Sequence, residues 1–225
     1  MTAPNGEPGS GMLTGVASEV RHPLFARFYA KVSPSAERKG AAAHREELLA
    51  GLQGRVIEVG AGNGLNFRHY PATVDEVVAV EPEDYLRARA QEAAPSAPVP
   101  VTVVAGVADR LPAQDGTFDA AVASLVLCSV PDQAAALAEI HRVLRPGGQL
   151  RFYEHVVDDR PRLAALQRRL DDWNIWPRFT GGCHVARDTG AEIVHAGFAI
   201  ERARGFPFAP GPVAVKHIIG VARRP

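Results

Sequence analysis

The sequence predicts an α/β fold in which a mostly parallel, seven-stranded sheet carries helices on both faces and ends in an antiparallel hairpin. Short apolar runs rich in valine alternate with helical stretches from about residue 55 onward. The runs between the helices are mostly apolar and do not alternate with polar residues, which is typical of parallel strands buried on both faces. The last two runs are joined by the Pro-rich loop FPFAPGP, which is too short to hold a crossover helix.

Each predicted element follows from its local pattern. The strands are predicted at 56–59, 77–80, 101–104, 119–127, 149–153, 198–204 and 215–223. The helices are predicted at 18–32, 36–50, 85–94, 132–144 and 160–172. Pro23 suits a helix start, where its missing N–H is not needed, and Gly51 or Gly54 suits the end of the second helix. The fourth helix carries an apolar stripe at helical spacing, formed by Leu137, Ile140, Val143 and Leu144.

The chain of 225 residues suits one domain with a small appendage. We expect residues 1–15 to be a disordered tail and residues 16–225 to form a single domain, because the first stretch is rich in Gly, Pro and Ser without periodicity. Within the domain, 16–52 would supply N-terminal cap helices. The stretch 157–195 breaks the alternation and would be an insertion on the substrate side, because ligands of open α/β sheets bind at the carboxyl ends of the strands.

Composition excludes several function classes. Twenty-five basic residues balance twenty-five acidic ones, which argues against a broad nucleic-acid footprint. The two cysteines cannot build a disulfide scaffold and lack the clustered spacing of a zinc site, so no metal is expected. The start of the chain lacks the pattern of a signal peptide, and no apolar run is long enough to span a membrane. We expect a cytoplasmic protein, with a composition compatible with a GC-rich bacterial genome; the sequence does not indicate an oligomeric state.

The motif EVGAGNG at 58–64 directly follows the first predicted strand. Its glycines permit a tight turn and let a ligand approach the backbone closely. Glu58 is a charge at the end of an apolar strand and therefore needs a partner. Glu81 ends the second strand, 21 residues after Gly60, where a carboxylate can accept hydrogen bonds from both ribose hydroxyls. The G-x-G-x-G spacing differs from the dinucleotide fingerprint G-x-G-x-x-G, which disfavours a nicotinamide dehydrogenase.

Five motifs in this order carry a family resemblance. They are E-V-G-x-G-x-G, V-x-x-V-E-P, A-D-x-L-P, F-D-x-x-V-A-S-L-V-L and H-R-V-L-R-P-G-G, across about residues 55–155. The set resembles the class I S-adenosylmethionine-dependent methyltransferases of the methyltransferase-11 type. The resemblance implies a Rossmann-like sheet, S-adenosyl-L-methionine as cofactor with S-adenosyl-L-homocysteine as product, no metal, and a small-molecule methyl acceptor rather than a nucleic acid.

The resemblance also implies a cofactor site. The glycines of the motif at 58–64 would surround the methionine end of the cofactor. Glu81 would hold the ribose, and Ala108 with Asp109 would lie beside the adenine. Many relatives carry Asp before that Ala, but here the position is Val107, so adenine recognition falls on backbone groups or on Asp109. The residues expected at the cofactor are Glu58, Gly60, Ala61, Gly62, Gly64, Asn66, Glu81, Pro82, Ala108, Asp109, Ser124 and Leu125.

A finer resemblance concerns the acceptor. The stretches G-L-N-F-x-x-Y-P (64–71), L-V-L-C-S-V (125–130), E-H-V (154–156) and G-C-x-x-x-R-x-T (182–189), with two Trp near 173–176, are similar to the animal alkyl-thiol S-methyltransferases. Those proteins methylate small thiols and carry an N-terminal membrane anchor. We expect this chain to be a soluble bacterial relative without such an anchor, acting on a thiol.

Methyl transfer from a sulfonium is an in-line displacement, so the protein must align the reactants, exclude water and deprotonate the acceptor where needed. His155 follows the fifth strand and is the first candidate for the base or for orienting the substrate. Cys183, beside His184, is the second catalytic candidate. The structural alternatives are a histidine bonded to a backbone carbonyl and a cysteine that serves as a small buried apolar residue.

Further residues are expected to bind the acceptor: Phe28, Tyr29, Cys128, Trp173, Trp176 and His184. The alternative for the aromatic residues is a place in the core. Two other functions stay open at this point. One is methylation of an oxygen or nitrogen atom of a natural product, quinone precursor or lipid amine instead of a thiol sulfur. The other is cofactor binding without methyl transfer.

Overall fold

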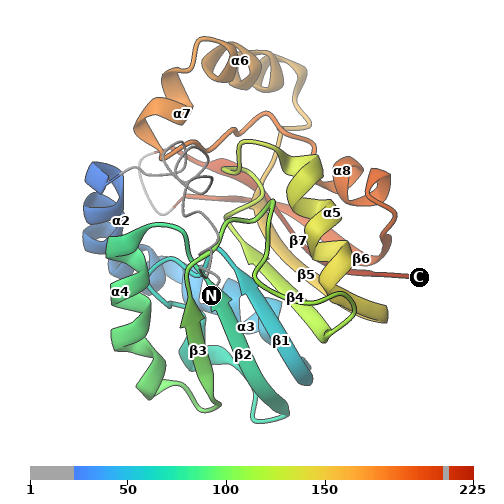
Figure 1. The fold of residues 1–225 in the computed structure, drawn as a ribbon. Coiled ribbons are helices and arrows are strands. Elements are labelled where there is room, and N and C mark those ends of the chain that lie inside the picture. Colours follow the sequence, from blue (N-terminus) through green and yellow to red (C-terminus); the bar gives the residue numbers. More distant parts are fainter. Residues whose placement is uncertain (1–22, 210–212) are drawn as a thin grey trace, which may run out of the picture.

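The computed structural model describes residues 23–209 and 213–225, so the expected tail 1–15 lies outside the described residues. Seven strands form one sheet in the order β3-β2-β1-β4-β5-β7-β6 (Figure 1). The strands are β1 (Gly54–Val59), β2 (Val74–Val80), β3 (Val101–Val104), β4 (Phe118–Ser124), β5 (Leu144–His155), β6 (Ala199–Phe208) and β7 (Val215–Arg223).

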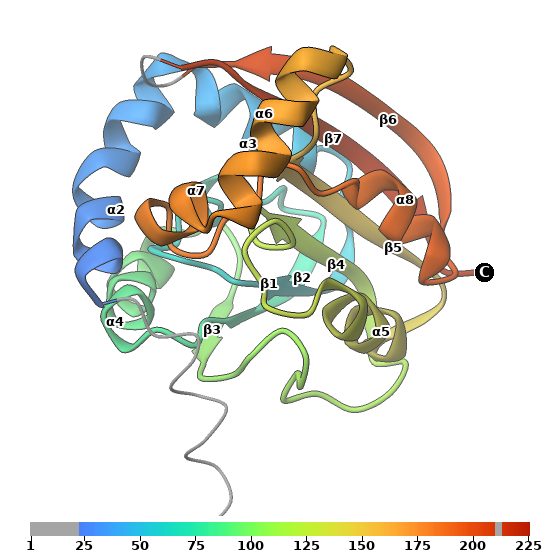
Figure 2. The same ribbon diagram turned by 90° about the horizontal axis from the view of Figure 1, so that it is seen from above.

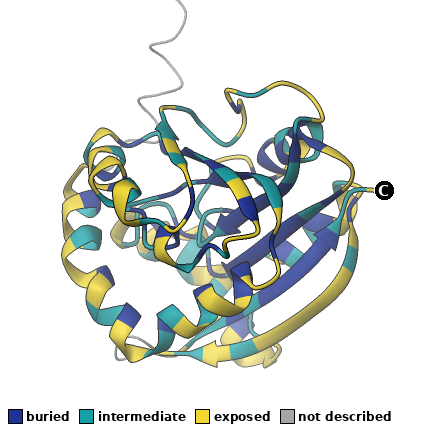
Figure 3. Cartoon of the chain, turned by 90° about the horizontal axis from the view of Figure 1, so that it is seen from below, coloured by how far each residue is buried: buried dark blue, intermediate teal, exposed yellow. Residues whose placement is uncertain are grey.

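The strand directions confirm the predicted fold class. β1 pairs in parallel with β2 and β4, β2 with β3, and β4 with β5. β7 is antiparallel to both β5 and β6, so the C-terminal hairpin completes the sheet. β7 lies between β5 and β6, and this places β6 at the edge, where most of its residues are exposed (Figure 3).

Helices cover both faces of the sheet and one of its ends. They are α2 (Pro23–Ala36), α3 (Ala42–Leu49), α4 (Asp84–Ala93), α5 (Gln133–Val143), α6 (Pro161–Asp172), α7 (Ile175–Phe179) and α8 (Thr189–His195), with short irregular turns η1 (Glu37–Ala41), η2 (Phe67–His69) and η3 (Ala94–Ser96). The predicted continuous helix 36–50 is wrong at its start, because Gly40, inside η1, has a φ of 119° and breaks the helical run before α3 begins at Ala42. Within the described residues, no helix is long and apolar enough to cross a membrane.

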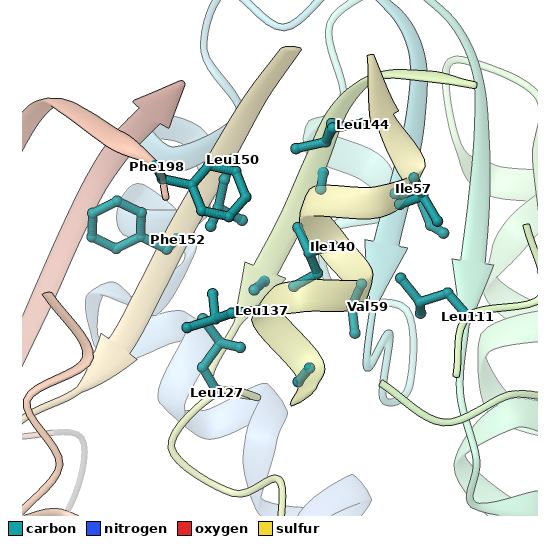
Figure 4. Packing of buried hydrophobic residues seen from close by; sticks show 14 of the residues in the cluster. Ile57, Val59, Leu111, Leu127, Leu137, Ile140, Leu144, Leu150, Phe152 and Phe198 are labelled. Atoms are coloured by element: carbon teal, nitrogen blue, oxygen red, sulfur yellow. The ribbon is translucent and has the colours of Figure 1, made fainter. Parts of the chain in front are cut away.

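Two hydrophobic clusters hold the layers together, one on each face. On the first face, α5 and α8 pack on the sheet through residues such as Leu137, Ile140 and Phe152 (Figure 4). On the second face, α3 and α4 pack through Leu48, Leu49 and others. Because successive side chains of a strand point to opposite faces, a fully buried strand contributes to both clusters, as the predicted continuous apolar runs require.

The fourth strand ends earlier than the sequence predicted. β4 stops at Ser124 instead of continuing to residue 127, because Leu125 adopts a left-handed φ of 60°. The backbone N–H groups of the next three residues then donate to the carboxylate of Glu154 instead of to a neighbouring strand. This turn directs residues 125–128 over the carboxyl end of the sheet.

A cap of helices lies above the carboxyl ends of the parallel strands. Seen from above, α7 lies between α2 and α6 over this edge (Figure 2). The chain after α7 packs on α2, since a Cβ added at Gly181 would fall 2.3 Å from Cδ1 of Phe25. The N-terminal helices and the stretch after β5 therefore meet over the edge where the sequence analysis expects the ligand.

Candidate active site

The glycine loop after β1 adopts backbone conformations that favour glycine. Gly60, Gly62 and Gly64 have φ values of 68°, 57° and 77°, all in the left-handed region. A Cβ added at Gly60 would lie 2.0 Å from Cγ2 of Val126, so this glycine lets the loop after β4 approach. At Gly62 the nearest atom would be Cε1 of Tyr29, at 3.6 Å. The loop backbone thus lies beneath a side chain of α2 with room beside it.

Glu81 follows β2 and is 5% exposed. Its Oε2 atom accepts a hydrogen bond from the N–H of Gly62 at 2.7 Å, and Oε1 accepts one from the N–H of Glu83 at 3.0 Å. Burial raises the pKa of this carboxyl, and the two N–H donors oppose that rise. Each carboxylate oxygen has two lone pairs, so both oxygens can still accept from the hydroxyls of a ribose.

Glu58 has the partners that its position in the strand requires. It is buried, and it accepts hydrogen bonds from Nδ2 of Asn66 at 2.8 Å and from the hydroxyl of Tyr70 at 2.7 Å. Burial raises the pKa of the Glu58 carboxyl to about 7. Glu58 and Asn66 therefore brace the glycine loop from below through a buried polar network.

Arg45 of α3 extends this network and was not predicted from the sequence as a site residue. The side chain is buried; its Nε donates to Oε1 of Glu37 at 2.9 Å, and Nη1 donates to Oδ1 of Asn66 at 2.8 Å and to Oγ of Ser124 at 3.1 Å. One guanidinium thus joins the cap helices, the glycine loop and the end of β4. A single arginine in a charged, Ala-rich helix carries no signal that distinguishes it from solvent-facing neighbours.

Asn63 offers an acceptor at the same loop. Its Nδ2 donates to Oγ of Ser33 at 3.1 Å, whereas its Oδ1 is buried and has no hydrogen-bond partner among the described residues. A buried polar atom without a partner marks a place where a ligand group would be satisfied. Beside it, a cleft of about 400 Å³ opens between α2 and α4, lined by Arg27, Ala30, Lys31, Asn63, Tyr85 and Arg89.

The remaining residues expected at the cofactor lie in the segments that follow β1, β2 and β3. Ala61 is buried and donates its N–H to the carbonyl of Val80 at 3.0 Å. The carbonyl of Pro82 accepts from Arg87 at 3.1 Å. After β3, Ala108 is half-buried against the core, while Asp109 is exposed.

Three sulfur and nitrogen atoms meet at the carboxyl end of β4 and β5. The Nδ1 atom of His155 lies 3.2 Å from Sγ of Cys183 and 3.5 Å from Sγ of Cys128, and the two sulfurs are 3.6 Å apart. Both cysteines are buried and not joined by a disulfide. We call these residues the Cys–His–Cys cluster. Sequence spacing did not predict it as a unit, because the two cysteines are 55 residues apart and only the fold brings them together.

Contacts within the cluster shift the pKa values of its three side chains. The thiol of Cys128 and the imidazole of His155 hold the pKa of Cys183 well below its usual range. The contact with Cys183 raises the pKa of Cys128 well above its usual range. Burial lowers the pKa of His155, but the adjacent Cys183 more than offsets it, and the net direction is upward. Contacts within the buried cluster therefore favour the thiolate form of Cys183 over that of Cys128.

Backbone contacts hold the cluster in position. The buried Glu154 accepts from the N–H groups of Val126, Leu127 and Cys128 at 3.0 to 3.1 Å. The N–H of His184 donates to the carbonyl of Cys128 at 2.7 Å. Glu154 was not predicted as a site residue, although a charge inside an apolar strand is the same signal that singled out Glu58.

His217 of β7 also adjoins the cluster and was not predicted. Its ring lies 4.5 Å from the ring of His155. Burial, followed by the charge of His155, lowers the pKa of His217 to about 3. Its Nδ1 faces the carbonyl of Val215 at 2.9 Å and so donates to it.

Some of the residues expected to bind the acceptor lie near the cluster or the glycine loop, and others are exposed. Trp176 is half-buried and packs against the Cys–His–Cys cluster, and Tyr29 lies at the glycine loop. His184 is half-buried, with Nδ1 3.8 Å from Oδ2 of Asp171. Phe28 and Trp173 are 60% and 68% exposed, so the structure does not gather their side chains with the rest.

Comparisons with known proteins agree with this geometry. The family described as "Methyltransferase domain" matches residues 57–152. The human protein named "Thiol S-methyltransferase TMT1B" is 31% identical over 88% of this chain and 85% of its own length. A phosphatidylethanolamine N-methyltransferase of Cereibacter sphaeroides is also 31% identical, over 81% of this chain and 85% of its own length.

Solved structures share the fold at lower identity. A methyltransferase of Methanosarcina mazei described as SAM-dependent is 21% identical, with a TM-score of 0.59, over 76% of this chain and 92% of its own. The [4+2]-cyclase SpnF is 21% identical, with a TM-score of 0.67, over 89% of this chain and 94% of its own. At such identities the structures support the fold alone. The kinship with TMT1B extends over most of both chains, and on that ground this protein belongs to the class I S-adenosylmethionine-dependent methyltransferases.

Proposed function

We propose that this methyltransferase transfers a methyl group to the sulfur of a small thiol. The observation that carries the proposal is the Cys–His–Cys cluster, a buried group of soft donor atoms at the carboxyl edge of the sheet. Its Cys128 lies two residues after Val126, whose side chain occupies the space next to Gly60. The cluster thus adjoins the glycine loop, as an acceptor site must. Relatives named thiol S-methyltransferases, at 31% to 33% identity, support the same conclusion.

The residues of the glycine loop fit S-adenosylmethionine. Glu81 would accept hydrogen bonds from the ribose hydroxyls, and the buried Oδ1 of Asn63 would accept one from the ammonium of the methionine part. The backbone at Gly60 and Gly62 would line that part, and Ala108 with Asp109 would lie at the adenine. Once bound, S-adenosylmethionine supplies an electrophilic methyl group on a positively charged sulfur.

The acceptor must react as a thiolate. A free thiol has a pKa of about 8.5, so modest stabilisation of the anion is enough at neutral pH. We place the acceptor sulfur beside His155, whose raised pKa favours the cationic imidazolium that would stabilise a thiolate. Trp176 and Tyr29 would close the site and exclude water, which strengthens the electrostatic interactions inside it.

A second candidate is methylation of a lipid amine. It is favoured by one observation, the 31% identity to the phosphatidylethanolamine N-methyltransferase of Cereibacter sphaeroides over most of both chains. An amine acceptor must lose a proton of much higher pKa than that of a thiol, about 10.4 for a lysine-like amine. The Cys–His–Cys cluster therefore suits a thiol acceptor better than an amine acceptor.

A panel of acceptors that differ only in the reacting atom separates the candidates. Hexanethiol, hexanol and hexylamine would be incubated with labelled S-adenosylmethionine, and cofactor affinity would be measured by calorimetry alongside. We expect product from the thiol with a kcat/KM at least 100-fold above that of the other two. Faster methylation of the amine would replace the thiol proposal with the second candidate. A Gly62→Arg variant, in which the side chain fills the space at the loop, supplies the background rate.

A further inference from the structure

We propose that Cys128, His155 and Cys183 bind one zinc ion, and that the ion's open coordination position takes the sulfur of the acceptor thiol. The ion site stands on the geometry of the Cys–His–Cys cluster alone. The role of the open position rests on the proposed thiol methylation. The two halves are therefore tested separately.

The distances within the cluster match those of a zinc site. The three donor atoms are separated by 3.2, 3.5 and 3.6 Å. In tetrahedral zinc sites, Zn–S bonds of about 2.3 Å and Zn–N bonds of about 2.0 Å place neighbouring donors roughly 3.4 to 3.8 Å apart. An ion would thus enter with displacements of a few tenths of an ångström. Two thiolates and one imidazole are also the donor types that zinc selects.

The donors are held in place before an ion arrives. Cys128 is tied to Glu154 by a hydrogen bond of 3.1 Å from its backbone N–H, and its carbonyl accepts from the residue that follows Cys183. His155 ends β5 in register with His217 of β7, and the two rings pack together. All three segments are therefore supported by the sheet or by backbone hydrogen bonds, as a metal site requires for affinity.

The ligand count leaves one position open. Among the described residues, the group of His, Cys, Asp and Glu donors that could share an ion here contains three members and no fourth. The two nearest histidines have other contacts: His217 donates to the carbonyl of Val215, and His184 faces Asp171. Three protein ligands with a free fourth position are the pattern of catalytic zinc, including sites with two cysteines and one histidine.

Such an ion would explain how a thiol is selected and activated. A thiol that coordinates zinc loses its proton, which here would pass to solvent. Two cysteine thiolates neutralise the ion, so an incoming thiolate adds one negative charge, which the positive sulfonium of the donor balances. The thiolate sulfur then forms a bond to the methyl carbon, while the bond from that carbon to the sulfonium breaks and leaves its electron pair on the donor sulfur. The thioether product is a weaker ligand and leaves.

The ion site is tested without any substrate. Protein stripped with a chelator and freed of any tag would be titrated with Zn²⁺ and, as a spectroscopic probe, with Co²⁺. We expect one ion per chain, with the strong absorption of tetrahedral Co²⁺ and the charge-transfer band of thiolate ligands. Because the chain has only two cysteines, both in the cluster, titration of reactive thiols reports on this site alone. Bound zinc should protect both.

Variants show whether these residues bind the ion. Cys183→Ser and Cys128→Ser should each weaken zinc binding by at least 100-fold, whereas His195→Ala, a change at an exposed histidine of α8, should not alter it. Circular dichroism shows whether each variant is folded. If a cysteine variant does not fold, the Co²⁺ spectrum of the wild type still shows whether thiolates coordinate the ion. Failure of the wild type to bind an ion, equal binding by the cysteine variants, or a mass lower by two hydrogens from a Cys128–Cys183 disulfide would overturn the site.

The open position is tested by adding hexanethiol to the Co²⁺ protein in the absence of methyl donor. A new thiolate charge-transfer band is expected, and hexanol should cause none. An ion that binds without any response to thiols would contradict the second half of the proposal and leave the ion site standing. Full thiol methylation by metal-free protein would overturn the catalytic role of zinc while leaving the proposed function intact.

Discussion

The backbone N–H of Gly62 donates a hydrogen bond of 2.7 Å to the carboxylate of Glu81, so the glycine loop and the end of β2 hold each other in position. These two elements are neighbours because β1 and β2 are adjacent parallel strands. The same carboxylate is the group that would bind the ribose of the cofactor. Positioning of the loop and recognition of the ligand are therefore coupled at one side chain.

Replacement of Glu81 by alanine should weaken cofactor binding by about 10- to 100-fold. Hydrogen bonds to a charged group contribute roughly 1.5–3 kcal/mol each, and the change also frees the N–H of Gly62. Calorimetric titration with S-adenosylhomocysteine measures the effect. Glu76→Ala, which alters an exposed carboxylate of the same strand, is the matched control and should bind normally. An unchanged affinity in Glu81→Ala would remove the ribose role.

Gly60 and Gly62 should respond differently to substitution by alanine. Both are strained by a positive φ, which costs about 1–2 kcal/mol for alanine, but only Gly60 also meets Val126, at 2.0 Å. We expect a larger loss of thermal stability in Gly60→Ala than in Gly62→Ala. Val126→Ala should partly rescue Gly60→Ala, because it removes the methyl carbon that clashes. Equal melting temperatures for the two single variants would contradict the close approach.

Loss of Arg45 should destabilise the protein and weaken cofactor binding together. Arg45→Met leaves Glu37 buried without its main partner, and breaking a buried ion pair in this way costs about 3–5 kcal/mol. It also removes the hydrogen bonds to Asn66 and Ser124. Urea denaturation measures the free energy of unfolding. In contrast, Arg89→Met breaks an exposed ion pair with Glu92 and should leave the free energy of unfolding nearly unchanged. Similar stability of the two variants would show that the Arg45 network is not structural.

The stability of the protein should fall as pH rises from about 4.5 to 7 through the contribution of Glu58. The folded pKa of this carboxyl is about 7 against an ordinary 4.5, so the native state retains a proton that the unfolded state has lost. Stability therefore decreases across this window and levels off above pH 7, by about 3 kcal/mol in all.

The difference between the wild type and Glu58→Gln isolates that contribution. The amide cannot ionise, so the variant should gain about 2–3 kcal/mol relative to the wild type between pH 5 and 8, in addition to a constant offset from altered hydrogen bonds with Asn66 and Tyr70. Urea denaturation at each pH measures both curves, with Glu76→Gln as the exposed control. Parallel curves for the wild type and Glu58→Gln would mean that Glu58 is ionised in the native state throughout.

Local patterns in the sequence were sufficient for most of the fold. Largely apolar runs, most of them rich in valine, located the five parallel strands, because a strand buried on both faces has little room for polar residues. The short loop before residue 215 indicated the hairpin, because a parallel connection needs a longer crossover. The end of β4 was misplaced, since Leu125 and the residues after it are as apolar as the strand itself and leave it only because Glu154 binds their N–H groups.

For the candidate site too, some parts could be predicted from local sequence patterns and others could not. The sheet, the glycine loop and the acidic residues Glu58 and Glu81 follow from local sequence patterns, because each depends on a strand and the turn directly after it. The position of Arg45 and the proximity of Cys128, His155 and Cys183, in contrast, depend on the tertiary fold. Those contacts join segments far apart in the chain, and their distances depend on how α3, β5 and the stretch after α7 pack over one edge of the sheet. No local pattern of residue types encodes that packing.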